Sequence, residues 1–165
     1  MLDRALRLSA SVPSLYPLLA FLTARRVVVR GWSMYPALAP GEHLLFDRLA
    51  YRLESPRRGD VVLASHPVRP GLCMIKRLAA MPGDAVVIDG DRCWVNGVLL
   101  GEGPTGEAMP PAGSRTLGAD EYLLLGDAPD FSTDGRQLGA VRRDDIQARA
   151  WLVYWPPGRM RAVRS

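Results

Sequence analysis

Three short stretches of the chain carry side chains that together could break a peptide bond. Ser33 lies in the run Gly-Trp-Ser-Met-Tyr-Pro at 31–36, Lys76 lies in an apolar stretch, and Ser132 follows a Gly-Asp pair. A serine hydroxyl is a poor nucleophile and needs a base that takes its proton as it attacks a carbonyl. These residues supply a nucleophile, a candidate amine base and a hydroxyl that could hold the base, which predicts a Ser/Lys hydrolase.

Lys76 is the best candidate for the base. The only histidines, His43 and His66, stand outside any Ser/His/Asp pattern, and we expect both to be solvated loop residues. Lys76 is the only lysine among 21 basic residues. An arginine stays protonated, whereas burial can remove the charge of a lysine. The alternative is a lysine that extends from a strand edge into solvent.

Four segments resemble the successive sequence boxes of type I signal peptidases. They keep the family's order and cover roughly residues 27–155. The segments are 31–38 (GWSMYPAL), 58–62 (RGDVV), 75–84 (IKR followed by PGD) and 126–139 (GD through Ser132, Asp134, Arg136 and Gly139).

The resemblance implies a role for each polar residue. Ser33 would be the nucleophile, Lys76 the general base, and the Ser132 hydroxyl would orient the lysine amine. Asp134 and Arg136 would form a supporting ion pair behind the site. The alternative is a surface pair that adds little stability, but their spacing from Ser132 on one short loop favours support of that hydroxyl. The substrate would be a secretory preprotein cut after small residues, with no cofactor.

The residues around Ser33 are candidates for the oxyanion and substrate pocket. Some family members carry a serine where this chain has Gly31, so the oxyanion would be bound mainly by backbone N–H groups near Ser33. Trp32, Met34 and Pro36 complete the candidate pocket. Trp32 and Met34 could also be ordinary core residues.

Other functions remain open at the level of sequence. The small size, the run 66–70 and the residues 154–157 are similar to small proteases of the same family that mature a nickel-type superoxide dismutase. The partner could then be one dedicated precursor. More remote alternatives are a self-cleaving Ser/Lys repressor, although the 32 residues before Ser33 show no helix-turn-helix pattern, and an inactive β-rich binding domain.

The apolar runs predict a mostly β fold in one catalytic domain, residues 27–165. They are short, rich in valine and leucine, and separated by glycine, proline and aspartate. Residues 84–125 are expected to form a small hairpin insertion with turns at 89–91 and 96–97, followed by a connecting loop.

Residues 1–26 are predicted to associate with a membrane, and the apolar part to be a short helix. Residues 8–24 are 17 uncharged positions, the minimum for a span, but Pro13 and Pro17 interrupt them. A helix lying on the bilayer is the alternative. We expect a bacterial plasma membrane protein with an extracytoplasmic catalytic domain. The flanking arginines favour the opposite topology, so a cytoplasmic or peripheral location stays open.

The net charge of +4 and the pI near 9.5 suit anionic lipid headgroups. A basic surface also suits nucleic acid, but no recognition helix or aromatic-basic motif is present, so no nucleic-acid partner is predicted. The two cysteines and two histidines lack metal-ligand spacing, so no metal is expected. Cys73 and Cys93 could pair in an extracytoplasmic domain.

Overall fold

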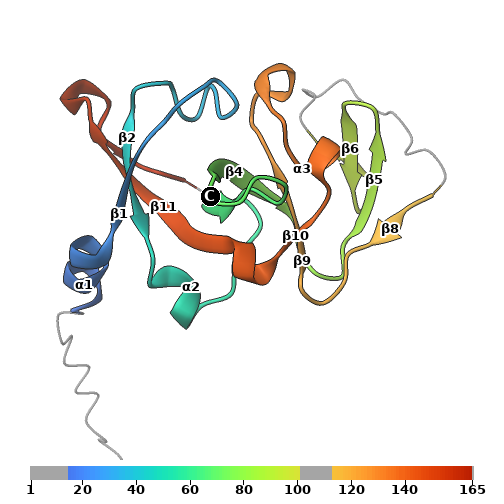
Figure 1. The fold of residues 1–165 in the computed structure, drawn as a ribbon, viewed down its shortest axis with the longest axis horizontal. Helices are drawn as coiled ribbons and strands as arrows, with labels where there is room; N and C mark the ends of the chain where they lie inside the picture. The colour runs from blue at the N-terminus through green and yellow to red at the C-terminus, as the bar shows by residue number, and fades with distance from the viewer. Residues whose placement is uncertain (1–14, 101–112, 165) are drawn as a thin grey trace, which may run out of the picture.

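The computed structural model describes residues 15–100 and 113–164, which fold mainly as antiparallel β-structure. Two sheets lie side by side along the long axis of the molecule (Figure 1). The larger sheet is at the left and centre of this view and the smaller sheet is at the right. The prediction of a mostly β protein is therefore confirmed.

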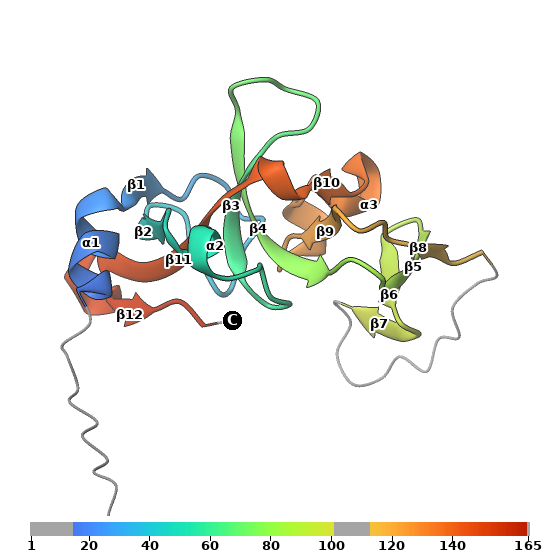
Figure 2. The ribbon, with the colours of Figure 1, turned by 90° about the horizontal axis from the view of Figure 1, so that it is seen from below.

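The larger sheet has eight strands in the order β1-β2-β11-β3-β4-β9-β10, with β12 paired to β11. Its strands are β1 (Arg25–Val28), β2 (His43–Asp47), β3 (Val61–Ser65), β4 (Cys73–Ala80), β9 (Glu121–Leu125), β10 (Val141–Arg142), β11 (Ile146–Trp155) and β12 (Arg161–Ala162). The hairpin of β3 and β4 projects from the body of the molecule (Figure 2). The long strand β11 bridges β2 and β3, so it joins the two halves of this sheet.

The smaller sheet has the strand order β7-β6-β5-β8. Its strands are β5 (Ala85–Asp89), β6 (Arg92–Val95), β7 (Val98–Leu100) and β8 (Arg115–Thr116). Asn96 and Gly97 both have positive φ, 50° and 81°, as the tight turn between β6 and β7 requires. The segment predicted as an insertion, 84–125, also contains β9, which pairs with β4 in the larger sheet. Residues 101–112 of the expected connecting loop lie outside the described residues.

Apolar side chains form a buried cluster that joins the Ser33 region to the larger sheet. Met34 and Leu38 pack there with Phe46 of β2, Leu63 of β3 and Val153 of β11. A second cluster packs α2 against the larger sheet, and a third lies between the two sheets. Burial of Met34 and Leu38 on either side of an irregular segment fixes that segment on the sheet without regular secondary structure.

The helices are short. They are α1 (Tyr16–Thr23), α2 (Ala50–Leu53) and α3 (Gly135–Leu138), with 3-10 turns η1 (Pro129–Phe131), η2 (Arg143–Asp145) and η3 (Pro157–Arg159). The expected N-terminal helix is present as α1. Ala20 is its buried residue, and the Tyr16 hydroxyl donates to the Asp47 carboxylate. Among the described residues, no helix reaches the length and apolarity of a membrane span; residues 1–14 lie outside this description.

Candidate active site

Lys76 lies in the middle of β4, paired with Val62 of β3, and only 4% of its surface is exposed. Burial lowers the pKa of its amine below the ordinary value of 10.5. Asp134 and Asp127 oppose this shift, and Arg136 adds to it. At a given pH, a larger fraction of Lys76 is therefore in the neutral amine form than of an exposed lysine. The alternative of a lysine extending from a strand edge into solvent is wrong.

The Lys76 amine is held by Ser132. Nζ of Lys76 donates to Oγ of Ser132 at 2.8 Å, and this hydroxyl donates in turn to Oδ2 of Asp134 at 2.6 Å. Because the Ser132 proton points to Asp134, its oxygen presents a lone pair to the amine. A neutral Lys76 that gives one N–H to Ser132 has its own lone pair directed elsewhere, and can accept a proton.

Asp134 and Arg136 form a buried ion pair behind Ser132. Nη2 of Arg136 lies 2.7 Å from Oδ2 of Asp134, and Asp134 is fully buried. Burial alone would raise the pKa of Asp134, but hydrogen bonds from Arg136, the Gly126 N–H and Ser132 outweigh it and lower the pKa. The carboxylate therefore stays ionised and accepts from Ser132. The alternative of a surface pair is wrong.

Gly126 brings Ser33 and Ser132 to the same place. It follows β9, and a Cβ built on it would lie 2.2 Å from Oγ of Ser132 and 2.5 Å from the carbonyl oxygen of Ser33. The same carbonyl accepts a 3.1 Å hydrogen bond from the N–H of Ala128. A side chain at position 126 would push the two serines apart. Sequence patterns suggest only a turn at Gly126-Asp127, so they do not predict this close approach.

Ser33 and Lys76 also line one groove, with a volume of about 560 Å³. The groove runs between β1 and the first half of β4. Its lining is Arg25, Arg26, Val27, Val28, Val29, Arg30, Ser33, Met34, Leu63, Leu72, Cys73, Met74, Ile75 and Lys76. A hydroxyl, a buried amine and an open groove are thus brought together by residues 43 positions apart in the chain.

Comparison with known proteins identifies the family to which the chain belongs. The family described as "Signal peptidase, peptidase S26" matches residues 5–155, which is most of the chain. The chain belongs to this signal peptidase family. The resemblance seen in the sequence boxes is therefore confirmed.

Relatives within the signal peptidase family come from several bacteria. The chain is 34% identical over 136 residues to a "Probable signal peptidase I-2" of Synechocystis, covering 78% of this chain and 62% of the relative. It is 34% identical to a "Signal peptidase I" of Leptolyngbya laminosa, covering 78% of this chain and 67% of that protein. The chain thus spans about two thirds of the length of these relatives.

Among solved structures, the chain is similar to the crystal structure of a signal peptidase I from Enterococcus faecalis. It has a TM-score of 0.43 and 24% sequence identity, and covers 58% of this chain and 97% of that chain.

The signal peptidase resemblance points to four residues around Ser33 as the oxyanion and substrate pocket. Of these four, only Met34 lines the groove. Met34 is buried in the core and also lines the groove. Gly31 has a φ of 83°, which favours glycine, and Pro36 is exposed; neither lines the groove. Trp32 is 52% exposed and packs edge-on against Tyr35, so the alternative of a core tryptophan is wrong.

A second ion pair beside the site, one arginine with one aspartate, is not among the predicted site residues. Arg77, next to the lysine, binds Asp127 through two parallel hydrogen bonds, Nε to Oδ1 at 2.7 Å and Nη2 to Oδ2 at 2.8 Å. This pair ties β4 to the turn that contains Gly126. The sequence offers one indication of this ion pair, because Arg77 directly follows Lys76 and Asp127 directly follows Gly126.

Of the two histidines and two cysteines, only Cys73 lines the groove. His43 begins β2 and packs edge-on against Tyr154, so the expectation of a solvated loop residue is wrong for it, because β2 is an internal strand. His66 lies in the β3–β4 loop, as expected. Cys73 and Cys93 are both free thiols, and burial raises the pKa of Cys93 to about 11. Within the described ranges, no cluster of histidine, cysteine and acidic residues could hold a metal.

Proposed function

We propose that this protein is a serine endopeptidase that removes N-terminal signal peptides from secretory preproteins, with Ser33 as nucleophile and Lys76 as general base. One observation carries the proposal. The amine of Lys76 is buried, is hydrogen-bonded to Ser132 at 2.8 Å, and opens onto the groove that Ser33 also lines. Membership of the signal peptidase family supports the substrate class.

The reaction follows from the proton positions. Neutral Lys76 takes the proton of the Ser33 hydroxyl while Oγ attacks the scissile carbonyl carbon. The tetrahedral intermediate collapses, the C–N bond breaks, and Lys76 gives its proton to the leaving amine. Lys76 then takes a proton from water, whose oxygen attacks the ester carbonyl carbon. The second tetrahedral intermediate collapses, the bond between that carbon and Oγ of Ser33 breaks, and Lys76 returns its proton to Oγ. The cleaved signal peptide leaves with a new C-terminal carboxyl group. Ser132 keeps the amine oriented throughout, and Asp134 with Arg136 supports Ser132.

Binding of the substrate depends on the groove wall and the backbone. Gly31 offers no hydroxyl, so backbone N–H groups near Ser33 would stabilise the oxyanion. Met34, Leu63 and Ile75 contribute apolar side chains to the lining of the groove, and Met34 and Leu63 are almost fully buried. Shallow pockets along this apolar lining would admit alanine-sized side chains and exclude larger ones. Small residues before the cleavage site are therefore the expected preference.

The protein would act at a bacterial plasma membrane with its catalytic domain on the outer side. Five large apolar side chains at α1 are 48–70% exposed: Leu15, Leu18, Leu19, Phe21 and Leu22. Exposed leucines on one short helix suit the boundary between lipid headgroups and acyl chains. Secretory preproteins reach the same boundary.

The test is cleavage of a secretory preprotein with an Ala-X-Ala site, in lipid or detergent. The parent should cleave after the second alanine, and the matched Ser33→Ala variant should not. An acylating inhibitor should label Ser33 in the parent. Equal cleavage by both proteins would refute Ser33 as nucleophile. Labelling of Ser33 without cleavage of the preprotein would instead indicate a narrower client, and would refute the general substrate class.

A further inference from the structure

Ser33 lies in a loop that is closed at its base by backbone hydrogen bonds. We define the nucleophile loop as residues 29–42. The Val29 N–H donates to the Glu42 carbonyl at 2.8 Å, and the Gly41 N–H donates to the Val29 carbonyl at 3.0 Å. Met34 and Leu38 fix one side of the loop in the apolar core. Other backbone N–H and carbonyl groups of the loop need hydrogen-bond partners outside these contacts.

Glu42 supplies one of these partners from inside the loop. Its side chain is only 2% exposed, and its Oε2 accepts from the Ala39 N–H at 3.0 Å. Both carboxylate oxygens also accept from Arg161, Oε1 from Nη1 at 2.8 Å and Oε2 from Nη2 at 2.9 Å. Nη2 of Arg161 donates to the Ala37 carbonyl as well. One guanidinium therefore joins the end of the loop, at Glu42, to its middle, at Ala37.

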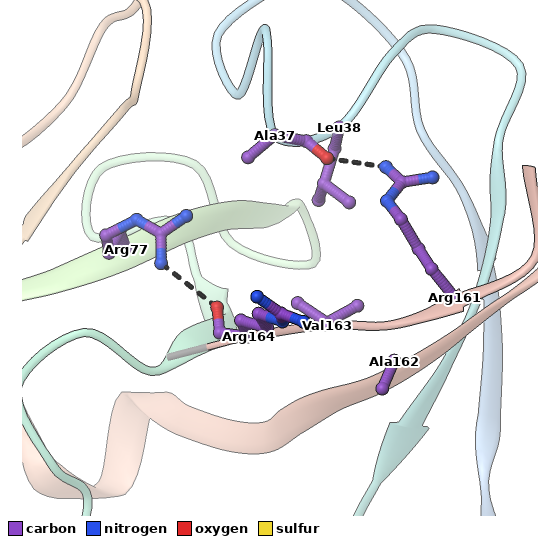
Figure 3. Close-up of a pocket in the computed structure, with 7 residues that line it drawn as sticks. All are labelled: Ala37, Leu38, Arg77, Arg161, Ala162, Val163 and Arg164. Carbon is purple, nitrogen blue, oxygen red and sulfur yellow. Dashed lines mark hydrogen bonds between the residues drawn. The ribbon is translucent and has the colours of Figure 1, made fainter.

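Arg161 is itself held by the strap, which we define as residues 160–164. Strand β12 pairs with β11, and the Val163 N–H donates to the Trp151 carbonyl at 2.9 Å. Further along, the Arg164 carbonyl accepts from Nη1 of Arg77 at 3.3 Å. Figure 3 shows both contacts, Arg161 with Ala37 and Arg77 with Arg164, around one cavity of about 560 Å³. The strap thus reaches from the nucleophile loop to the residue next to Lys76.

We propose that Arg161 is a positioning residue that sets the place of Ser33 relative to Lys76. The inference rests on the proposed function, in which Ser33 gives its proton to Lys76. Arg161 touches neither of them and acts through the nucleophile loop. Arginine suits this task because its planar fork can bind both carboxylate oxygens and a carbonyl together. A misplacement of about 1 Å between reacting groups can lower a rate on the order of 100-fold.

The experiment compares the parent with Arg161→Ala and Arg161→Lys, and uses Arg115→Ala as the matched control. Arg115 forms an exposed ion pair with Glu121, away from the nucleophile loop. At 25 °C, kcat of Arg161→Ala should fall about 10- to 100-fold while KM changes much less, because Ser33 is displaced and most residues that line the groove lie outside the nucleophile loop. The kcat of Arg161→Lys should lie between those of the parent and Arg161→Ala, since an ammonium group keeps the charge but cannot reproduce the planar fork of a guanidinium. Arg115→Ala should match the parent.

Hydrogen exchange of the backbone amides provides a readout independent of catalysis. Exchange in residues 30–41 should be faster in Arg161→Ala than in the parent or in Arg115→Ala. Nη1 of Arg159 lies 3.7 Å from Oε1 of Glu42, so a cation stays near the carboxylate when Arg161 is replaced. If Arg161→Ala does not fold, Arg161→Lys carries the same comparison.

Two results would overturn the inference. One is a parental kcat in folded Arg161→Ala or, if only the lysine variant folds, in Arg161→Lys. The other is a variant that loses thermal stability while exchange in the nucleophile loop stays as in the parent. Failure of the proposed function looks different, because then the parent neither cleaves the preprotein nor is labelled at Ser33. In that case the exchange data alone decide whether Arg161 holds the loop.

Discussion

At the scale of a single residue, two opposing effects set the charge state of Lys76. Burial disfavours its charged form, and Asp134 and Asp127 favour it. The net effect is a lowered pKa, so part of the lysine population is neutral at a pH where an exposed lysine would be charged. Ser132 then decides where the amine points. Burial thus makes the Lys76 amine reactive, and the hydrogen bond to Ser132 orients it.

The first prediction concerns the pH dependence of activity. The value of kcat/KM should rise with pH as Lys76 loses its proton, with a midpoint below 10.5, because burial lowers this pKa. Initial rates on a peptide substrate across the pH range would measure it. Lys76→Arg should be inactive throughout, since its guanidinium stays protonated. A profile with its maximum in acid would point to a different base.

The second prediction concerns stability. Between the lowered pKa of folded Lys76 and 10.5, the unfolded chain holds a proton that the folded chain has lost, so the stability of the parent should increase with pH in that window. Lys76→Met should lack this contribution and be inactive. At pH 7 its free energy of unfolding should equal or exceed that of the parent, since the variant buries no amine.

Urea denaturation at several pH values would test this second prediction. A loss of more than about 1 kcal/mol in Lys76→Met at pH 7 would show that the charged amine stabilises the fold. The pH dependence of the parent would then have another origin.

At the scale of elements, the turn after β9 connects the two serines. A Cβ added at Gly126 would meet both the Ser132 hydroxyl and the Ser33 carbonyl oxygen, and the Gly126 N–H donates to Asp134 at 2.8 Å. Asp127 extends the contact to Arg77 of β4. Three segments distant in the chain, around positions 33, 77 and 126–134, therefore meet at one turn, and its backbone must come closer than a side chain allows.

The third prediction is that Gly126→Ala lowers kcat on the order of 100-fold, because its Cβ would displace Ser33 or Ser132. Stability should fall by about 1–3 kcal/mol, as for other overpacked sites. Gly158→Ala is the matched control, since a Cβ added at Gly158 would meet nothing within 4 Å. Steady-state kinetics and thermal unfolding of both variants give the comparison. Full activity in Gly126→Ala would mean that the turn moves freely.

At the scale of the whole molecule, the apolar surface at α1 stands beside β1, which lines the groove. Figure 1 places α1 and β1 together at one end of the larger sheet, with the smaller sheet at the other end. Binding of α1 to a bilayer would therefore bring the groove, and not the smaller sheet, toward the lipid.

The fourth prediction is that Leu18→Ser with Leu22→Ser weakens binding to anionic vesicles by at least about tenfold, since burying each leucine is worth roughly 1.5–3 kcal/mol. Leu53→Ser, on α2, is the control, because Leu53 is as exposed as Leu22, at 69%. Vesicle co-sedimentation would measure binding. Cleavage of a short soluble peptide should be the same in all variants. Equal binding of the double variant would exclude α1 as the contact.

Local patterns in the sequence account for much of what the structure contains. The alternation of short apolar runs with turn residues predicts the strands, and Asn96-Gly97 predicts a tight turn that is present. Residue type and order single out Ser33, Lys76 and Ser132, and the structure brings them to one groove or one hydrogen-bond network. These features depend on residue identity and near neighbours, which the sequence states directly.

Long-range packing decided the rest. Local pattern could not show that His43 begins an internal strand or that Trp32 stays exposed. It also could not show that Arg161 reaches Glu42, 119 residues away. Residue types and local spacing indicate which groups can react and which segments form strands. Tertiary structure decided how closely they approach, because the clearance at Gly126 and the burial of Lys76 depend on how all the strands pack together.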